Sequence, residues 1–138
     1  MKFIIESIPI PKSRHRTKIL GRRIITYDPQ HQEKIRTKNI IRHQMAQNNY
    51  SILENCPLEI EVMSFVEIPQ SLSVKKQEEL DGTYCYKRPD IDNYCKNYFD
   101  ILNEIAYKDD GQIASLISKK IYSKNPRVEI TLNSIGKR

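Results

Sequence analysis

Apolar and acidic residues alternate most regularly over residues 58–68, where Leu58, Ile60 and Val62 are separated by single glutamates. Because successive side chains of a strand point to opposite faces, this segment predicts a strand with one buried and one solvated face. Further strands are predicted, from β-branched composition or alternation, over residues 2–10, 19–27, 112–122 and 127–133. The segment 19–27 contains Gly21 and is compatible with a hairpin, whereas the basic residues 12–18 predict a loop.

Helical signals occupy two longer segments. Asp28 followed by Pro29 is typical of a helix start and predicts a helix over about residues 29–48 with a basic exposed surface. A second helix is predicted over 90–107, because apolar residues recur on one face at about 100° per residue. The residues of that face are Cys95, Tyr98, Leu102 and Ile105. A shorter polar segment, 71–81, has a helical pattern that stops at Gly82.

These elements predict an α+β fold in which a single mixed β-sheet is packed by two main α-helices. The chain has 138 residues, enough for one domain over residues 1–138 and too few for two ordinary ones. Its 38% hydrophobic and 29% charged residues support a folded domain with one modest core.

The N-terminal segment and the cysteines indicate the cytoplasm. No apolar run approaches the roughly 20 residues that cross a bilayer, and the N-terminus lacks the apolar core of a signal peptide. The three cysteines are odd in number and form no C-x-x-C pair, so we expect free thiols and no zinc site.

Positive charge is concentrated in the first third of the chain. Residues 1–50 have a balance of +8, whereas residues 51–138 have a balance of −2. Such asymmetry favours a polyanionic partner, and charge alone leaves a solvated basic face as an equal alternative. The candidate phosphate-binding residues are Lys12, Arg14, Arg16, Lys18, Arg22 and Arg23, together with the basic side of the predicted helix 29–48.

The chemistry is concentrated where Asp90 and Asp92 begin the second predicted helix. Two carboxylates aimed into one space repel each other, and a hard divalent cation such as Mg²⁺ relieves that repulsion through oxygen ligands. Asn93 adds a further oxygen or donor, and Lys96 lies one helical turn after Asp92, within reach of the same place. The alternative is that the two aspartates are helix caps, which spacing alone leaves open.

Asp109 and Asp110 offer a third carboxylate, which could equally belong to a turn. The ends of a helix over 90–107 lie about 22–27 Å apart, so Asp110 meets Asp90 only if strand 112–122 folds back along the helix. Other uses of a D-x-D pattern fail: the later positions of a calcium loop are absent, and no P-loop sequence exists.

The order of these motifs resembles the RusA family of Holliday junction resolvases. The resembling segments are R-P-D-I-D-N-Y-C-K (88–96), Y-K-D-D-G-Q-I (107–113), K-K-I-Y (119–122), V-E-I-T-L (128–132) and the N-terminal I-P-I-P-K-S-R-H-R (8–16). Tyr94 stands where the family usually has leucine, which affects packing and leaves the carboxylates untouched.

The resemblance implies metal ligands and catalytic carboxylates at Asp90, Asp92 and Asp110, and a catalytic lysine at Lys96. It implies a homodimer that uses Mg²⁺, for which Mn²⁺ substitutes, to resolve four-way DNA junctions by paired symmetric nicks in recombination and repair. A prophage origin fits the family. Two alternatives stay open: a nuclease for other branched or flap DNA, and a non-catalytic DNA-binding protein whose acidic cluster is structural.

Overall fold

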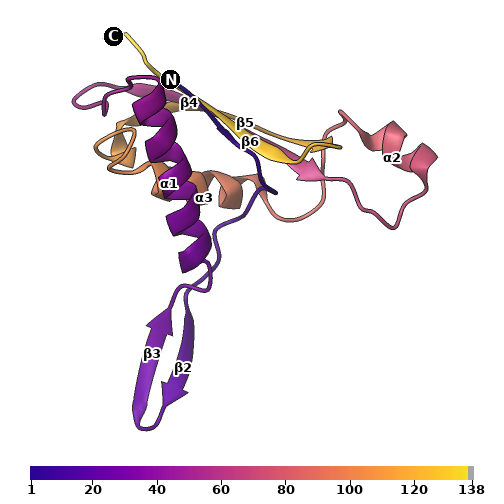
Figure 1. Cartoon of the computed structure of the whole chain (residues 1–138), viewed down its shortest axis with the longest axis horizontal. Helices are drawn as coiled ribbons and strands as arrows, with labels where there is room; N and C mark the ends of the chain where they lie inside the picture. The colour runs from indigo at the N-terminus through magenta and orange to yellow at the C-terminus, as the bar shows by residue number, and fades with distance from the viewer. Residues whose placement is uncertain (137–138) are drawn as a thin grey trace.

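The computed structural model describes residues 1–136 and contains a four-stranded sheet, a separate hairpin and three α-helices (Figure 1). In chain order the elements are β1 (Lys2–Ile5), β2 (Arg16–Leu20), β3 (Arg23–Tyr27), α1 (His31–Gln47), β4 (Leu58–Glu67), α2 (Val74–Leu80), α3 (Ile91–Leu102), the 3-10 turn η1 (Asp110–Gln112), β5 (Ile113–Ser123) and β6 (Arg127–Ser134). The α+β fold with a mixed sheet packed by two main helices is therefore confirmed.

The sheet has the order β1-β6-β4-β5. β4 pairs antiparallel with β6 and parallel with β5, so the connection that holds α2 and α3 crosses from β4 back to the start of β5. The predicted alternation of β4 is confirmed, because every second side chain from Leu58 to Val66 is buried. β5 lies at the edge of the sheet, which leaves part of its backbone without a neighbouring strand.

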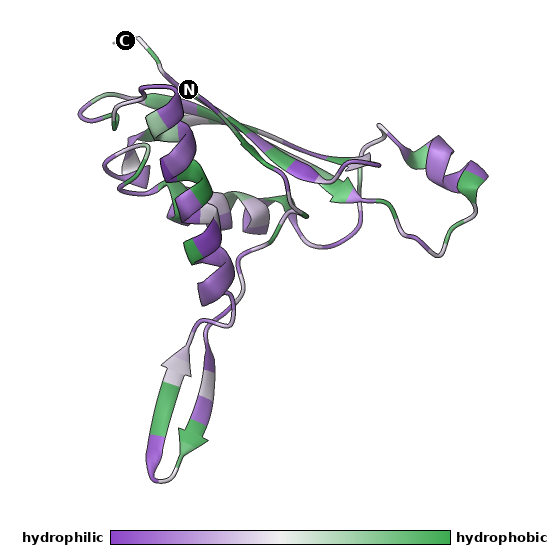
Figure 2. Ribbon diagram, in the orientation of Figure 1, coloured by the Kyte–Doolittle hydropathy of each residue, from purple (hydrophilic) through white to green (hydrophobic). Residues whose placement is uncertain are grey.

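The core fills the space between one face of the sheet and the helices α1 and α3, which lie on the same side of it (Figure 1). The cross-strand pairs Phe3–Ile130 and Val62–Ile130 place buried side chains of three strands on that face. Figure 2 shows hydrophobic residues along the sheet and on the sides of the helices that meet it. Within residues 1–136 the helices are all too short or too polar to cross a membrane.

The helix predicted from Pro29 begins two residues later, at His31. Asp28 does not cap it in the expected way: Gln30 occupies the cap position, and one Asp28 oxygen accepts a 2.9 Å hydrogen bond from the Gln30 amide. The other oxygen accepts a 2.8 Å bond from Lys34 Nζ. This bond from Lys34 lowers the pKa of the Asp28 carboxyl below its usual 3.8.

The predicted second helix ends five residues early, at Leu102 instead of Tyr107. Asn103 is extended and Glu104 has a φ of +63°, so the chain turns sharply. The turn buries Ala106 and Tyr107, and Leu53 pairs with this segment through its amide and carbonyl groups. A continuous helix would carry Tyr107 away from the core, so burial of this side chain outweighs the helical pattern.

The basic segment predicted as a loop is partly a strand. Arg16–Leu20 pairs antiparallel with Arg23–Tyr27, so the hairpin anticipated around Gly21 forms and its first strand begins three residues before the predicted segment. Gly21 has a φ of +61° at the first position of the two-residue turn, a conformation that glycine adopts without strain. The hairpin projects away from the sheet and both main helices (Figure 1).

We predict that Asp28→Asn lowers the free energy of unfolding by about 1 kcal/mol at pH 7, because it removes the charge that binds Lys34 while keeping an oxygen for Gln30. The Asp28 pKa is lower in the folded protein, so its contribution is present above about pH 3.8 and is lost as the pH falls through the folded value. Urea denaturation of both proteins between pH 2 and 7 measures this difference. Equal stability at pH 7 would contradict the role of the ion pair.

Candidate functional site

Asp90 and Asp92 lie at the start of α3, and neither is used as a helix cap. Asp90 occupies the N-cap position, but its side chain makes no capping hydrogen bond. Asp92 lies in the first turn, and one of its oxygens is 3.5 Å from Lys96 Nζ. All three side chains are exposed. The helix start thus presents two carboxylates and an ammonium to solvent, and the cap interpretation of Asp90 is wrong.

Lys120 on β5 holds the chain immediately before this helix. Its ammonium donates hydrogen bonds of 2.6 Å to the Lys87 carbonyl and 2.7 Å to the Pro89 carbonyl. The Arg88–Pro89 peptide bond between them is cis. The edge strand therefore fixes the backbone from which Asp90 projects. Sequence analysis missed this role of Lys120, because the two segments are about thirty residues apart.

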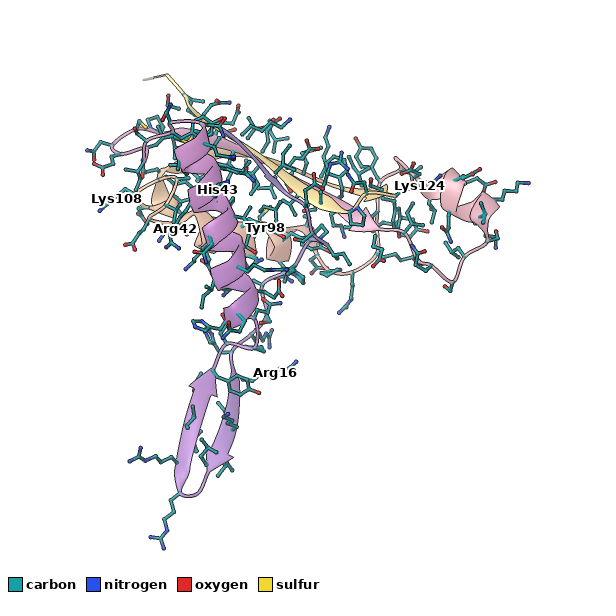
Figure 3. All side chains as sticks on the ribbon, in the orientation of Figure 1. Arg16, Arg42, His43, Tyr98, Lys108 and Lys124 are labelled. Atoms are coloured by element: carbon teal, nitrogen blue, oxygen red, sulfur yellow. The ribbon has the colours of Figure 1, made fainter. Side chains whose placement is uncertain are left out.

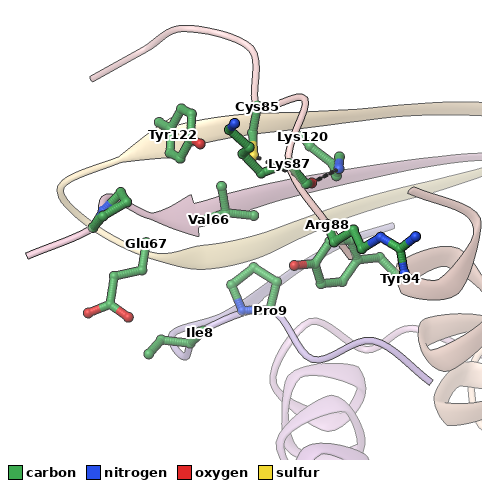
Figure 4. Close-up of a pocket in the computed structure, with 11 residues that line it drawn as sticks. Ile8, Pro9, Val66, Glu67, Cys85, Lys87, Arg88, Tyr94, Lys120 and Tyr122 are labelled. Carbon is green, nitrogen blue, oxygen red and sulfur yellow. Dashed lines mark hydrogen bonds between the residues drawn. The ribbon is translucent and has the colours of Figure 1, made fainter. Parts of the chain in front are cut away.

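A half-open pocket of about 270 Å³ lies beside this segment (Figure 4). Its apolar side is formed by Ile8, Pro9 and Val66, and its polar side includes Arg88 and the Tyr94 phenol. Burial raises the pKa of Tyr94, so the phenol stays protonated and can donate at neutral pH. Arg88 and Tyr94 thus bring a positive charge and a hydrogen-bond donor to a pocket that Asp90 itself does not line.

Asp109 and Asp110 have different roles. Asp109 forms a capping box with Gln112: its carboxylate accepts from the Gln112 backbone, and the Gln112 side chain accepts a 3.0 Å bond from the Asp109 amide. The Asp110 amide donates a 3.1 Å bond to Asn103 Oδ1, while its carboxylate makes no hydrogen bond or ion pair with residues 1–136. The turn interpretation thus holds for Asp109 and leaves the Asp110 carboxylate free.

Asp110 lies at the opposite end of α3 from Asp90 and Asp92. β5 does fold back along the helix, but it runs in the opposite direction: Asp110 contacts the C-cap Asn103, whereas Lys120 contacts Pro89. The helix of 12 residues between these contacts spans about 18 Å. Accordingly, no three His, Cys, Asp or Glu side chains of the described residues gather closely enough to hold a metal ion.

The basic N-terminal segment is anchored on the same helix. The Lys12 amide donates to the Asn93 carbonyl at 2.9 Å, and the Ile10 amide donates to the Tyr98 hydroxyl at 3.0 Å. Asn97, which is buried, donates from Nδ2 to the Ile10 carbonyl at 2.8 Å. Burial raises the pKa of Tyr98 to about 12, so its hydroxyl stays protonated. Figure 3 labels this residue, which lies beside α1. These contacts place the Lys12 backbone against Asn93, the residue after Asp92, and Ile10 one to two helical turns farther along α3.

The six candidate phosphate-binding residues divide into one paired and five unpaired cations. Lys12 Nζ lies 2.6 Å from Asp100 Oδ2, so part of its charge is already neutralised. The other five make no ion pair with any residue of the described chain and are exposed. They are Arg14, Arg16, Lys18, Arg22 and Arg23. Figure 3 shows Arg16 at the base of the hairpin, with cationic side chains reaching out from its tip.

The three cysteines are free, as predicted. Cys95 lies on the buried side of α3, and its thiol lies 3.3 Å from the Ser118 hydroxyl. Burial raises the pKa of this thiol, so it packs as a small apolar side chain and is a poor nucleophile.

Comparisons with known proteins extend over most of the chain. Residues 6–133 match the family model described as endodeoxyribonuclease RusA. The uncharacterized protein YqaN of Bacillus subtilis (strain 168) is 29% identical over 140 residues, which cover 99% of this chain and 97% of that protein. The crossover junction endodeoxyribonuclease RusA of Lactococcus phage r1t is 28% identical over 117 residues, which cover 75% of this chain and 84% of that one.

We predict that Lys120→Met loosens the segment that leads into α3, because two carbonyls lose a charged donor. The bonded amides on either side of this segment, Cys85 (to the Lys120 carbonyl) and Asn93 (to the Asp90 carbonyl), should exchange with deuterium about tenfold faster than in the unchanged protein. Lys119→Met is the matched control, since Lys119 is exposed and makes no side-chain hydrogen bond to the described residues. Equal exchange in both variants would show that Lys120 does not position Asp90.

Proposed function

The chain belongs to the RusA family of endodeoxyribonucleases, and on this premise we propose that it is a Mg²⁺-dependent enzyme that resolves four-way DNA junctions by paired symmetric nicks in recombination and repair. The observation that carries the proposal is the start of α3. Asp90 leaves its carboxylate uncapped beside Asp92, and Lys96 Nζ lies 3.5 Å from Asp92. Exposed carboxylates that do not cap the helix are available as oxygen ligands for a divalent cation.

The donor chemistry fits a hard divalent ion, because the proposed ligands are carboxylate oxygens. Asp90, Asp92 and Asp110 would hold the ion. When bound, it would supply positive charge to the scissile phosphate and lower the pKa of a coordinated water. Mn²⁺ should substitute, since it takes the same oxygen ligands.

The remaining steps fall to residues of the chain itself. Lys96, whose Nζ lies 3.5 Å from Asp92, would donate to a phosphate oxygen or to the leaving oxygen, which gains negative charge as the bond breaks. The free amides at the start of α3 favour an anion at the same place. The pocket at Arg88 and Tyr94 would hold a neighbouring phosphate, and the products would be 5′-phosphate and 3′-hydroxyl ends.

The position of Asp110 makes the homodimer part of the proposal. Within one chain the length of α3 separates Asp110 from Asp90 and Asp92. Three ligands therefore meet only if Asp110 comes from a second copy. A two-fold dimer would build two such sites at once, which is what paired symmetric nicks require.

Asparagine substitutions test the reaction. We predict that Asp90→Asn, Asp92→Asn and Asp110→Asn each abolish Mg²⁺-dependent cleavage of a synthetic four-way junction while junction affinity changes little, because the amide keeps the shape and loses the charge that binds metal. Linear duplex, flap and single-stranded DNA are the substrate controls. Cleavage of flap DNA in preference to the junction would indicate another branched substrate. Tight junction binding without cleavage in Mg²⁺ or Mn²⁺ would indicate a non-catalytic DNA-binding protein.

Mixed dimers test the origin of Asp110. Asp90→Asn and Asp110→Asn chains, each inactive alone, are co-expressed with different affinity tags and purified on both. If Asp110 acts across the dimer, one of the two sites is intact, and we predict nicking at about half the rate of the unchanged protein. A mixed dimer of Asp90→Asn with Asp92→Asn is the matched control and should be inactive, because both sites are damaged. Inactivity of the first mixture would place Asp110 in the site of its own chain.

A further inference from the structure

The hairpin β2–β3 has two chemically different faces. The cross-strand pairs Arg16–Tyr27, Lys18–Ile25 and Leu20–Arg23 share one face, because side chains alternate along each strand. Lys18 Nζ lies 5.5 Å from the centre of the Tyr27 ring, as expected for neighbours on that face. The other face carries the pairs Thr17–Thr26 and Ile19–Ile24 and has no charge.

The uncharged face ends in apolar side chains that stay largely exposed within residues 1–136. Ile19 and Ile24 are each 75% exposed, and Leu20 on the opposite face is 53% exposed. They lie next to the turn, at the end of the hairpin farthest from the sheet, and Figure 2 shows hydrophobic residues there beside hydrophilic ones. An exposed apolar pair on a projecting ribbon indicates contact with a partner.

The surrounding charge identifies that partner as DNA. Residues 11–27 contain six Lys or Arg and no Asp or Glu. If two copies of the hairpin packed together through their isoleucines, these like charges would be brought close, which costs free energy. Phosphates on either side of the ribbon would instead neutralise them.

The part of DNA that suits an uncharged apolar pair is the face of a base pair. In linear duplex these faces are covered by stacking, whereas a four-way junction can open them at its branch point. Proteins that distort DNA insert isoleucine, leucine or phenylalanine side chains between base steps in this way. With five-residue strands, the hairpin reaches about 16 Å from its base, enough to enter between two arms.

We propose that the β2–β3 hairpin is a branch-point wedge: Ile19 and Ile24 contact unstacked base pairs at the centre of the junction, while Arg22, Arg23 and the cationic face hold the phosphates of the adjoining arms. This inference rests on the proposed function and assigns the selectivity for branched DNA to residues outside the metal site.

The test measures binding alone, in the Asp92→Asn protein, so that cleavage plays no part. Ile19→Thr with Ile24→Thr keeps the β-branched shape and removes the apolar contact. We expect junction affinity to fall about tenfold, while linear-duplex affinity and the salt dependence of binding stay the same. If 2-aminopurine is placed at the branch point, its fluorescence should rise when the parent protein binds and unstacks it, and this rise should disappear in the isoleucine variant. Arg22→Ala with Arg23→Ala should instead weaken binding to both the junction and the linear duplex and make the salt dependence of binding shallower.

Val74→Thr is the matched control, because Val74 is 72% exposed on α2, away from the hairpin. It should leave every value unchanged. An unaltered ratio of junction to duplex affinity in the isoleucine variant overturns the inference. So does a variant that sediments as a monomer where the unchanged protein sediments as a dimer, because the face would then be a contact between copies. If the unchanged protein cuts no DNA, but the isoleucine substitutions still abolish its preference for the junction, the wedge is supported and only the proposed function is refuted.

Discussion

The packing of α3 against the sheet is the constraint on which the site depends. Tyr98, Ile101 and Leu102 are buried on one side of the helix, and that burial fixes both its rotation and its direction. With this side inward, Asp92 and Lys96 must face solvent together. The same helix holds Ile10 through Asn97 and Tyr98, so one element positions both the acidic pair and the start of the basic segment that leads into the hairpin.

The edge strand β5 connects the two ends of this arrangement. The 3-10 turn just before it places Asp110 beside the C-cap of α3, and Lys120, on the second half of the strand, contacts Pro89 just before the N-cap. Because the strand runs antiparallel to α3, it brings the Lys120 ammonium to the start of the helix. Asp110, which precedes the strand, lies at the other end of the helix. This topology supports the backbone before Asp90 and separates Asp110 from Asp90 within one chain, which is why the proposed metal site calls on a second copy.

The hydrogen bonds of the aspartates distinguish those that stabilise local structure from those whose carboxylates are available to a ligand. Asp109 and Gln112 satisfy each other's backbone groups, and Asp28 satisfies the Gln30 amide and Lys34, so each of these carboxylates stabilises local structure. Asp90 occupies the position where an aspartate normally caps, yet it makes no capping bond. Asp110 is likewise unpaired within the part of the chain that the structure describes. Asp90 and Asp110, whose carboxylates take no part in capping, are both positions that the family pattern marks.

The sequence by itself determined the fold class, the alternation of β4, the apolar side of α3 and the pairing of Asp92 with Lys96, because each depends on neighbours within a few positions of one another. Only the tertiary structure decided that α3 ends at Leu102, since burial of Tyr107 requires contacts with Leu53. It also decided that Lys120 holds Pro89 and that Asp110 lies a helix length from Asp90. The spacing of residues along the chain limits how far apart two residues can lie. Their actual positions depend here on the direction in which β5 returns along α3, and that direction is set by the pairing of the whole sheet.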